Sequence, residues 1–456
     1  MLGDDWKGWQ NFASSVLRPH SLHPGCDWKE HHAVVIESDD WGMCGEGKDR
    51  EAHQRLSALG YKLDSRPGRL NYANTLETQG DLEALYRTLE GFKDRLGRSP
   101  VVTANFIVTN PDYPRIEEEG FAKYHFVPIS EGFPGTWSLR GTALEVWRSG
   151  IRRKLVVPEY HGFSHCNQVN WMEGLRRGDK RLLDFFREEM VTSSRRYATV
   201  SEYGIAGPGG IAFESFWDQY REVAAGCEIF REAFGRDPRL TIPPHDVSDS
   251  RTLLAFAKAG MNLVQSERRT LTGILGLRPL GPRSVLHATA RAITQLTVTF
   301  RWYRNVRLEP KESRSKDEAT SALELSNRIL RAGGPVIVGS HRQNYVAGVE
   351  PDNAGQGRRR LASFLAGLRE DPKLVFLSSF EAAQLSLHGH STERFGDEYL
   401  LRNYTRGDVT VLVQGARGHL LKDLTKDQPA DRLAVDSDSG VKVAIPPGTC
   451  LALSKE

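Results

Sequence analysis

Hydrophobic positions along this chain fall into short, nearly continuous runs that alternate with longer segments of mixed character. Strands that are apolar almost throughout are typical of parallel sheets covered on both faces. The runs that predict strands are Ala33–Ser38, Val101–Val108, Leu155–Tyr160, Leu240–Pro243, Asn262–Ser266, Val336–Ser340 and Leu374–Ser378.

The segments between these runs carry apolar residues at helical spacing, which predicts amphipathic helices. The helices are expected at Gly80–Leu96, Asn170–Glu189, Phe213–Phe234, Thr252–Ala259, Lys316–Ala332 and Gln356–Arg369. Seven strands in series with helices between them predict an α/β fold, and we expect a distorted (β/α)7-type barrel. An open doubly wound sheet is the competing arrangement.

Two regions break the alternation. The segment Asp112–Thr142 is rich in Gly, Pro and aromatic residues, which predicts a long loop at the mouth of the barrel. Towards the C-terminus, short alternating runs with Gly and Pro turns predict a small β appendage. We therefore divide the chain into an N-terminal extension (1–30), the barrel (31–390) and a small β-rich C-terminal domain (391–456).

Composition narrows the range of partners. The 456-residue chain has 61 Lys and Arg against 58 Asp and Glu, a net charge of +3 that is too even to indicate nucleic-acid binding. No apolar run is long enough to span a membrane, and the first residues lack the apolar core of a secretory signal. Five scattered cysteines without a C-x-x-C pair indicate a reducing compartment and neither a disulfide framework nor a thiolate zinc site. We expect a cytoplasmic protein.

Polar residues of a catalytic kind stand at the ends of several predicted strands. The run "VVIESDDWG" ends in Asp39 and Asp40, "EYHGFSH" supplies His161 and His165, and "VIVGSH" ends in His341. Because a parallel barrel gathers the carboxyl ends of its strands at one mouth, these groups are expected to form a cluster that can hold a divalent metal. The alternatives are a surface turn for the aspartates and a helix N-terminus for the histidine pair.

The segments "ESDDWG", "HGFSH" and "VGSH" resemble the polysaccharide deacetylase superfamily, which carries T-F-D-D-G, H-[ST]-x-x-H and L-x-H motifs. The phrases "HGFSHCNQVNW" and "SHRQNY" are similar to those of a branch of uncharacterised bacterial proteins in that superfamily. The resemblance implies that Asp40, His161 and His165 are ligands of a divalent metal, most often Zn²⁺, with Co²⁺, Ni²⁺ or Mn²⁺ as other choices. It further implies that Asp39 is the catalytic base and His341 the catalytic acid.

The chain also departs from the superfamily pattern. Ser38 and Gly162 replace the usual phenylalanine and Ser/Thr, and "RLTIPPHD" only loosely matches the segment whose arginine, here Arg239, would orient the base. No aspartate that would orient His341 is evident, and Glu267 is the nearest candidate. Further substrate-binding candidates lie beside the strand ends: Trp41, Asn105, Tyr160, His245 and Asp246.

These observations predict a metal-dependent hydrolase that removes acetyl groups, chiefly N-acetyl, from the sugars of a polysaccharide, oligosaccharide or glycan precursor. One alternative is a glycoside hydrolase in which Asp39 acts with Glu159 or Asp246. The others are an inactive carbohydrate-binding barrel and an enzyme that hydrolyses a small cyclic amide.

Overall fold

One large parallel sheet organises the protein, in a computed structural model that describes residues 26–45, 47–63, 74–141, 143–197, 199, 202–203, 216–248, 250–266, 300–310, 318–429, 434–437 and 439–455. Within this part of the chain the sheet has nine strands in the order β8-β7-β6-β5-β2-β1-β10-β9, with β11 paired to β1. The strands are β1 (His32–Trp41), β2 (Val102–Ile107), β5 (Val156–Gly162), β6 (Leu240–Thr241), β7 (Leu263–Ser266), β8 (Phe300–Tyr303), β9 (Val306–Arg307), β10 (Val336–His341) and β11 (Leu374–Leu377).

The sheet curls into a distorted barrel because its two end strands are neighbours along the chain. Strand β8 pairs with β7 and strand β9 pairs with β10, while only Arg304 and Asn305 separate β8 from β9. The α/β barrel class is therefore confirmed. Its seventh strand is this Phe300–Arg307 segment, which was not predicted. The predicted strand Leu374–Ser378 instead pairs with the first half of β1, from His32 to Val35.

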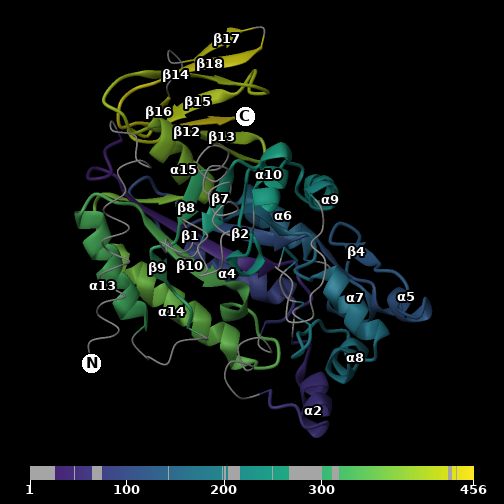
Figure 1. The fold of residues 1–456 in the computed structure, drawn as a ribbon. Coiled ribbons are helices and arrows are strands. Elements are labelled where there is room, and N and C mark those ends of the chain that lie inside the picture. The colour runs from purple at the N-terminus through teal and green to yellow at the C-terminus, as the bar shows by residue number, and fades with distance from the viewer. Residues whose placement is uncertain are drawn as a thin grey trace, which may run out of the picture.

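Helices surround the sheet (Figure 1). Their bounds are α2 (Arg50–Ala58), α4 (Gln79–Glu90), α6 (Leu144–Arg152), α7 (Gln168–Arg176), α8 (Lys180–Arg187), α9 (Phe216–Phe234), α10 (Ser250–Lys258), α13 (Glu318–Arg331), α14 (Asp352–Leu368) and α15 (Ser379–His388). The predicted helix Asn170–Glu189 is two helices, because Gly178 has a φ of 73° and Asp179 caps a new helix at Leu182 N. The remaining predicted helices lie within a few residues of α4, α9, α10, α13 and α14.

The predicted long loop Asp112–Thr142 has structure of its own. It holds the helix α5 (Tyr113–Glu118), the strand β4 (Phe126–Pro128) and a 3-10 helix, η1 (Gly135–Arg140). Strand β4 pairs with β3 (Thr109–Pro111), which directly follows β2. The Gly and Pro residues therefore mark short turns between small elements at the mouth, and the prediction of an irregular loop was wrong.

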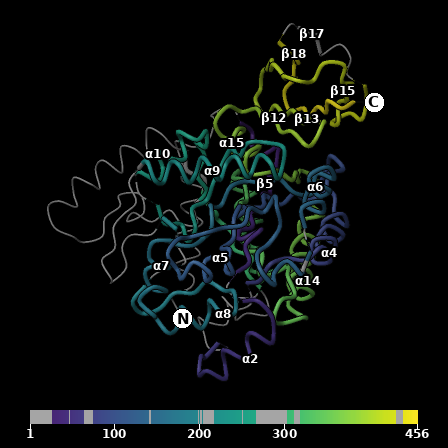
Figure 2. Tube along the Cα trace, turned by 90° about the vertical axis from the view of Figure 1, so that its right-hand side faces the viewer, coloured from purple at the N-terminus to yellow at the C-terminus, as the bar shows by residue number. Residues whose placement is uncertain are grey.

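The C-terminal strands form two antiparallel sheets in the order β12-β13-β19-β15-β16 and β14-β18-β17. Their bounds are β12 (His390–Phe395), β13 (Glu398–Asn403), β14 (Val409–Val413), β15 (Leu420–Asp423), β16 (Gln428–Pro429), β17 (Ala434–Ser437), β18 (Gly440–Ile445) and β19 (Cys450–Ser454). They share a small apolar core that includes Leu401, Val443 and Leu453. Figures 1 and 2 both show this appendage at one end of the barrel, with α2 at the opposite end.

The appendage packs against the amino ends of the barrel strands. Phe395 and Leu400 form one buried cluster with Val101 and Val157, which lie at the beginnings of β2 and β5. The carboxyl ends of the strands thus face away from the appendage. None of the described helices is long and apolar enough to cross a membrane.

Candidate metal and catalytic site

The two adjacent aspartates serve one site because β1 is irregular where it ends. Neighbouring residues of a regular strand point to opposite faces. Between Ser38 and Trp41 the register of β1 against β2 shifts, and Asp40 has a φ of 71°. A β-bulge of this kind redirects a side chain and is common beside active sites. The bulge brings both carboxylates to the same mouth of the barrel.

Gly42 completes the turn that follows the aspartates. Its φ is 77°, and a Cβ atom there would lie 2.7 Å from the carbonyl oxygen of Ile107. Its backbone N–H donates to Glu77 Oε1 at 3.0 Å, and its carbonyl accepts from Asn110 Nδ2 at 2.8 Å. A glycine is required here for both conformation and space, which explains the last letter of "DDWG".

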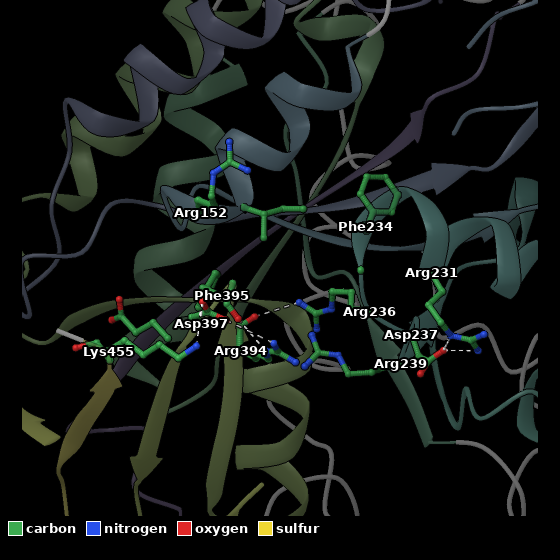
Figure 3. Close-up of a pocket in the computed structure, with 15 residues that line it drawn as sticks. Arg152, Arg231, Phe234, Arg236, Asp237, Arg239, Arg394, Phe395, Asp397 and Lys455 are labelled. Atoms are coloured by element: carbon green, nitrogen blue, oxygen red, sulfur yellow. Dashed lines mark hydrogen bonds and ion pairs between the residues drawn. The ribbon is translucent and has the colours of Figure 1, made fainter. Parts of the chain in front are cut away.

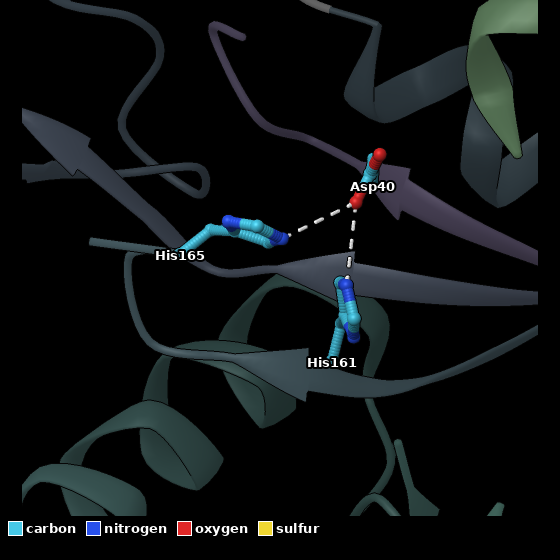
Figure 4. Close-up of side chains that lie close together, drawn as sticks. All are labelled: Asp40, His161 and His165. Atoms are coloured by element: carbon cyan, nitrogen blue, oxygen red, sulfur yellow. Dashed lines mark ion pairs between the residues drawn. The ribbon is translucent and has the colours of Figure 1, made fainter. Parts of the chain in front are cut away.

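Asp40, His161 and His165 converge on one point (Figure 4). Asp40 Oδ1 lies 3.3 Å from His161 Nε2 and 3.6 Å from His165 Nε2, and the three ligand atoms lie within 4.8 Å of one another. His161 stands at a second irregularity, where the register of β5 against β2 shifts between Tyr160 and Gly162. Two imidazole nitrogens and a carboxylate oxygen are a donor set that Zn²⁺ takes in catalytic sites.

The second polar atoms of His161 and Asp40 are engaged elsewhere, which leaves their converging atoms for an ion. His161 Nδ1 lies 2.7 Å from the carbonyl oxygen of Ile242, and Asp40 Oδ2 accepts from Asn74 Nδ2 at 2.8 Å. Burial lowers the pKa of His165 to about 3, so that this imidazole is neutral and can act as a ligand. Partners of this kind orient the ligands of a metal. The residues present therefore fit a divalent cation.

The turn that carries His165 is held by a buried carboxylate, that of Glu202. Glu202 Oε1 accepts from Phe163 N at 2.8 Å, and Oε2 accepts from Ser164 N at 2.8 Å and from His165 N at 2.7 Å. A Cβ atom on Gly162 would lie 2.8 Å from Glu202 Oε1. The glycine that departs from the superfamily pattern thus makes room for this carboxylate.

Asp39 has a different environment from Asp40, although the two are adjacent. Arg304 donates to both of its oxygens, NH1 to Oδ2 at 2.7 Å and NH2 to Oδ1 at 2.6 Å, and Asn105 Nδ2 donates to Oδ1 at 2.7 Å. Burial alone would raise the pKa of Asp39, but the charge of Arg304 and its hydrogen bonds lower it to about 2. Asp39 is thus a fixed, ionised carboxylate.

His341 lies on the other side of Asp39, with Nε2 3.8 Å from Asp39 Oδ2. Its Nδ1 lies 2.6 Å from Glu309 Oε1, and Glu309 Oε2 accepts from Asn344 Nδ2 at 2.6 Å. Burial alone would lower the pKa of His341, but Glu309 together with both aspartates raises it to about 10. Glu309 is the residue that orients His341. Glu267, predicted for this role, lies outside the described residues.

The remaining substrate-binding candidates differ in their positions. Asn105 is fully buried between Asp39 and Gln265, so it supports Asp39 and is not open to a substrate. Trp41 and Tyr160 are buried in the barrel wall as part of the large apolar core, where neither ring face is open to a sugar. His245 is exposed, and its ring centroid lies 5.2 Å from that of His165. Asp246 is half-buried beside it, in the short 3-10 helix η2 (Pro244–Asp246).

Arg239 and Glu159 belong to the opposite end of the barrel. Arg239 NH2 donates to Glu159 Oε1 at 2.9 Å and to Glu393 Oε2 at 2.9 Å. Arg239 therefore does not orient Asp39, and the arginine that does is Arg304. Glu159 is fully buried and bound to this arginine, so it cannot form a glycosidase pair with Asp39.

Sequence reasoning missed Arg304, Glu309, Glu202 and Asn74. Arg304 and Glu309 lie in "RWYRNVRLEP", whose alternation of aromatic, apolar and charged residues is a signal for a strand. The "SHRQNY" segment was a further signal. Its Asn344 holds Glu309, the partner of His341. Its Arg342 donates from NH2 at 2.7 Å to Oδ1 of Asn74, the residue that binds Asp40.

No protein-family model and no curated protein matches the chain. Among solved structures, Agd3, a novel carbohydrate deacetylase, aligns over 99% of this chain and 69% of its own, at 10% identity and a TM-score of 0.43. The Xyl-CE4 domain of a multidomain xylanase from the hindgut metagenome of Trinervitermes trinervoides aligns over 76% of this chain and 87% of its own, at 8% identity and a TM-score of 0.32. The 4-alpha-glucanotransferase from Thermococcus litoralis aligns over 76% of this chain, at 10% identity and a TM-score of 0.36. The alignment covers only 39% of the length of that protein. Carbohydrate deacetylases are thus among the structural neighbours, but at these values the function has to be argued from the site.

Proposed function

We propose that this protein is a metal-dependent hydrolase that removes acetyl groups from a sugar. The observation that carries the proposal is the meeting of three units at one barrel mouth. They are an Asp-His-His donor set, a carboxylate fixed by Arg304 and an imidazole fixed by Glu309. A base and an acid 3.8 Å apart beside a metal site are the groups that hydrolysis of an acyl bond needs.

Asp40, His161 and His165 would hold the ion, with Zn²⁺ as our first choice and Co²⁺, Ni²⁺ or Mn²⁺ as others. When bound, a divalent ion supplies Lewis-acid chemistry, because it polarises an acyl carbonyl and makes a water molecule more acidic. Asn74 and the carbonyl of Ile242 fix the direction of Asp40 and His161. Glu202 fixes the backbone that carries His165.

Asp39 would accept the proton of the attacking water. Arg304 and Asn105 hold both of its oxygens in place, so the carboxylate is oriented before substrate arrives. The same arginine keeps Asp39 ionised over the whole physiological range of pH.

His341 would donate a proton to the leaving amine or alcohol. With its pKa raised, the imidazole is protonated at neutral pH, and Glu309 on Nδ1 leaves Nε2 to face the site. A cation at Asp40 would offset part of the negative charge that raises this pKa, and so would bring it closer to the pH at which an acid works best.

The acetylated sugar rests on the motif resemblance, which favours N-acetyl groups of a polysaccharide, oligosaccharide or glycan precursor. A glycoside hydrolase is less well supported, because Glu159 is committed to Arg239 and the two histidines would have no task. An inactive binding protein would not need the orienting contacts of Arg304 and Glu309.

Elemental analysis of the purified protein tests the site. We expect about one divalent ion per chain in the wild type and in Asp39→Asn, and loss of that ion in Asp40→Ala and His165→Ala. Asp427→Ala, which removes a highly exposed carboxylate of the appendage, is the matched control and should retain the ion.

An acetate-release assay over N- and O-acetylated sugars then tests the reaction. Asp39→Asn should keep the metal and lose activity by about 10²–10⁴-fold, as expected for removal of a general base. Metal retained in both ligand variants would refute the site. Metal bound at this site without acetate release from any of these sugars would refute the reaction.

A further inference from the structure

A second cavity lies at the opposite end of the barrel, between its amino end and the appendage (Figure 3). It has a volume of about 860 Å³, within the range of small-molecule binding sites. Its walls come from the end of α6, the end of α9 with the following turn, the turn between β12 and β13, and the end of β19 with the residue after it. Arg239 precedes β6, whereas the proposed metal ligands lie at or just after the carboxyl ends of β1 and β5, so the two sites lie at different ends.

The lining of this cavity is rich in positive charge. Of the described side chains that line it, three are acidic and six are basic, namely Arg152, Arg231, Arg236, Arg239, Arg394 and Lys455. Acidic partners neutralise part of the rim, since Arg231 lies 2.6 Å from Asp237 and Lys455 lies 3.5 Å from Asp397. The excess of positive charge is therefore concentrated around the remaining arginines.

Arg236 and Arg239 bring two guanidinium groups to a single carboxylate, that of Glu393. Arg239 donates to Oε2 at 2.9 Å and also binds Glu159. Arg236 donates to Oε1 at the longer distance of 3.3 Å. Arg236 also donates to the carbonyl oxygen of Arg394, again at 3.3 Å. Burial and the charge of Arg239 lower the pKa of Arg236. Arg236 therefore has weaker neutralisation than its neighbour, and the 15% of its side chain that is exposed can be reached from the cavity.

Arg394 adds a third guanidinium group beside this pair, as Figure 3 shows. Its side chain is 56% exposed, and its Nε donates to the carbonyl oxygen of Gly396 at 2.7 Å. Its nearest carboxylate, Asp397, lies 3.9 Å away and is shared with Lys455. A planar guanidinium group can donate two parallel hydrogen bonds to a carboxylate or a phosphate group, so arginines gathered in this way favour an anionic ligand.

We propose that this cavity is a second binding site, for a small ligand whose carboxylate or phosphate group binds Arg236 and Arg394. The remainder of the ligand would occupy the space between the barrel and the β12–β13 turn. Binding at this site does not depend on the metal or on hydrolysis, so it can be tested independently of the proposed function.

Titration calorimetry of the full-length protein tests this proposal with three probes: inorganic phosphate, trigalacturonate and the neutral trisaccharide maltotriose. We expect one equivalent of phosphate, of trigalacturonate or of both to bind, more weakly at high salt, while maltotriose does not bind. Binding of phosphate alone identifies a phosphate-bearing ligand, and binding of trigalacturonate alone identifies a carboxylate-bearing saccharide.

Three variants place the binding in the cavity. Arg394→Gln and Arg236→Gln should each weaken the anion by about tenfold or more, because each removes a charge-assisted hydrogen bond. Arg236→Lys should weaken it less, since it keeps the charge and loses the two-pronged geometry. Arg369→Gln, at an exposed arginine after α14, is the matched control.

No binding of either anion, equal binding of maltotriose, or unchanged affinity in Arg394→Gln would overturn the proposal. Of the two proposed ligand-binding arginines, Arg394 is the exposed one. The affinity of Arg394→Gln therefore tests the proposal even where Arg236→Gln fails to fold. Thermal melting of each variant shows which proteins are folded before the affinities are compared.

Discussion

Asp39 and Asp40 are adjacent in sequence, but each has its own set of partners. Asp39 faces a guanidinium and an amide, whereas Asp40 faces two imidazoles and a different amide. Because each negative charge has its own positive or polar partners, the two carboxylates can be buried side by side without sharing a proton. In the proposed mechanism their environments, rather than their residue type, would assign one to proton transfer and the other to metal binding.

The pair of Arg304 with Asp39 predicts a change at the acid side of the pH profile. The arginine lowers the pKa of Asp39, so Arg304→Gln should raise it, and activity should then fall at a higher pH as the solution is acidified. The measurement is kcat/KM against pH. Arg307→Gln, at an exposed arginine of β9, should leave the acid limb in place. An unmoved limb in Arg304→Gln would show that Asp39 is not the group that must be ionised.

The pair of Glu309 with His341 predicts a change at the alkaline side. An acid must be protonated to act, and Glu309 raises the pKa of His341. Glu309→Gln should therefore lower that pKa and shift the alkaline limb of kcat/KM to lower pH. Glu324→Gln, at an exposed position of α13, is the control. A limb that stays where it was would separate His341 from the proton that limits the rate.

Glu202 predicts an effect on metal affinity without contact to the metal. In Glu202→Gln the amide nitrogen faces backbone N–H donors, so the turn of Phe163 to His165 loses at least one of its three hydrogen bonds. Loss of such an outer partner typically weakens a metal site by about 10–100-fold. Competition with a chelator measures the affinity, and Glu228→Gln, exposed on α9, is the control. Unchanged affinity would mean that the turn holds its shape without Glu202.

At the scale of elements, the sequence predicted the strands that contain a mostly apolar run and missed the segment in which charged residues interrupt the pattern. Strands β1, β2, β5 and β10 each contain such a run, for example Ala33–Ile36 in β1. The segment Phe300–Arg307 is interrupted by arginines, because Arg304 turns inward to pair with Glu37 and Asp39. A buried ion pair of this kind cannot be predicted from the pattern of one strand, because the carboxylates that bind the arginine lie on another strand.

The same reasoning explains which site residues could be predicted. The three proposed ligands, the base and the acid each stand at a strand end, and their order along the chain matches a known set of motifs. Glu202, Arg304 and Glu309 support them through contacts across long stretches of sequence, in segments without a regular apolar pattern. Such contacts follow from the closure of the barrel, which the sequence predicted only as a class.

The β5 turn predicts the effect of a single added methyl group. In Gly162→Ala the new Cβ would lie 2.8 Å from Glu202 Oε1, so the carboxylate must move away from the turn. We expect a loss of about 1–3 kcal/mol in the free energy of unfolding, as for other overpacked sites, together with weaker metal binding. Chemical denaturation and metal competition measure the two effects.

Gly80→Ala is the control for this substitution. Gly80 lies in α4, and the nearest atom to its Cβ would be Thr78 Oγ1 at an ordinary 3.8 Å. Gly80 is exposed in the first turn of α4, so we expect this variant to change the free energy of unfolding by no more than about 0.5 kcal/mol. Equal effects of the two alanines would contradict the role of Gly162 as space for a carboxylate.

At the scale of the whole molecule, buried charges link the barrel to the appendage. Glu393 of β12 binds Arg239 and Arg236 of the barrel and accepts from Ser378 Oγ at 2.8 Å. Nearby, Arg402 of β13 donates to Glu381 of α15 at 3.0 Å, and both side chains are fully buried. Because neither part can lose the other without exposing unpaired charge, we expect the two to unfold in one transition.

Glu393→Gln tests this link. Removing one member of a buried ion pair leaves its partners uncompensated, which typically costs about 3–5 kcal/mol, whereas the exposed control Asp427→Asn should leave stability nearly unchanged. Calorimetry should show a lower melting temperature for the whole protein, while metal affinity at the far end of the barrel stays unchanged. Two separate transitions in the wild type would contradict the link.

The dependence of this effect on pH has a definite sign. Burial alone would raise the pKa of Glu393, but Arg239 and Arg236 lower it below the ordinary value for glutamate. Its contribution to stability is therefore complete above that ordinary value and is lost as the pH falls through the lowered one. The difference in the free energy of unfolding between wild type and Glu393→Gln should accordingly be largest near neutral pH and shrink as the solution is acidified. A difference that grows towards low pH would mean that Glu393 is held protonated, and that the arginines are neutralised by another group.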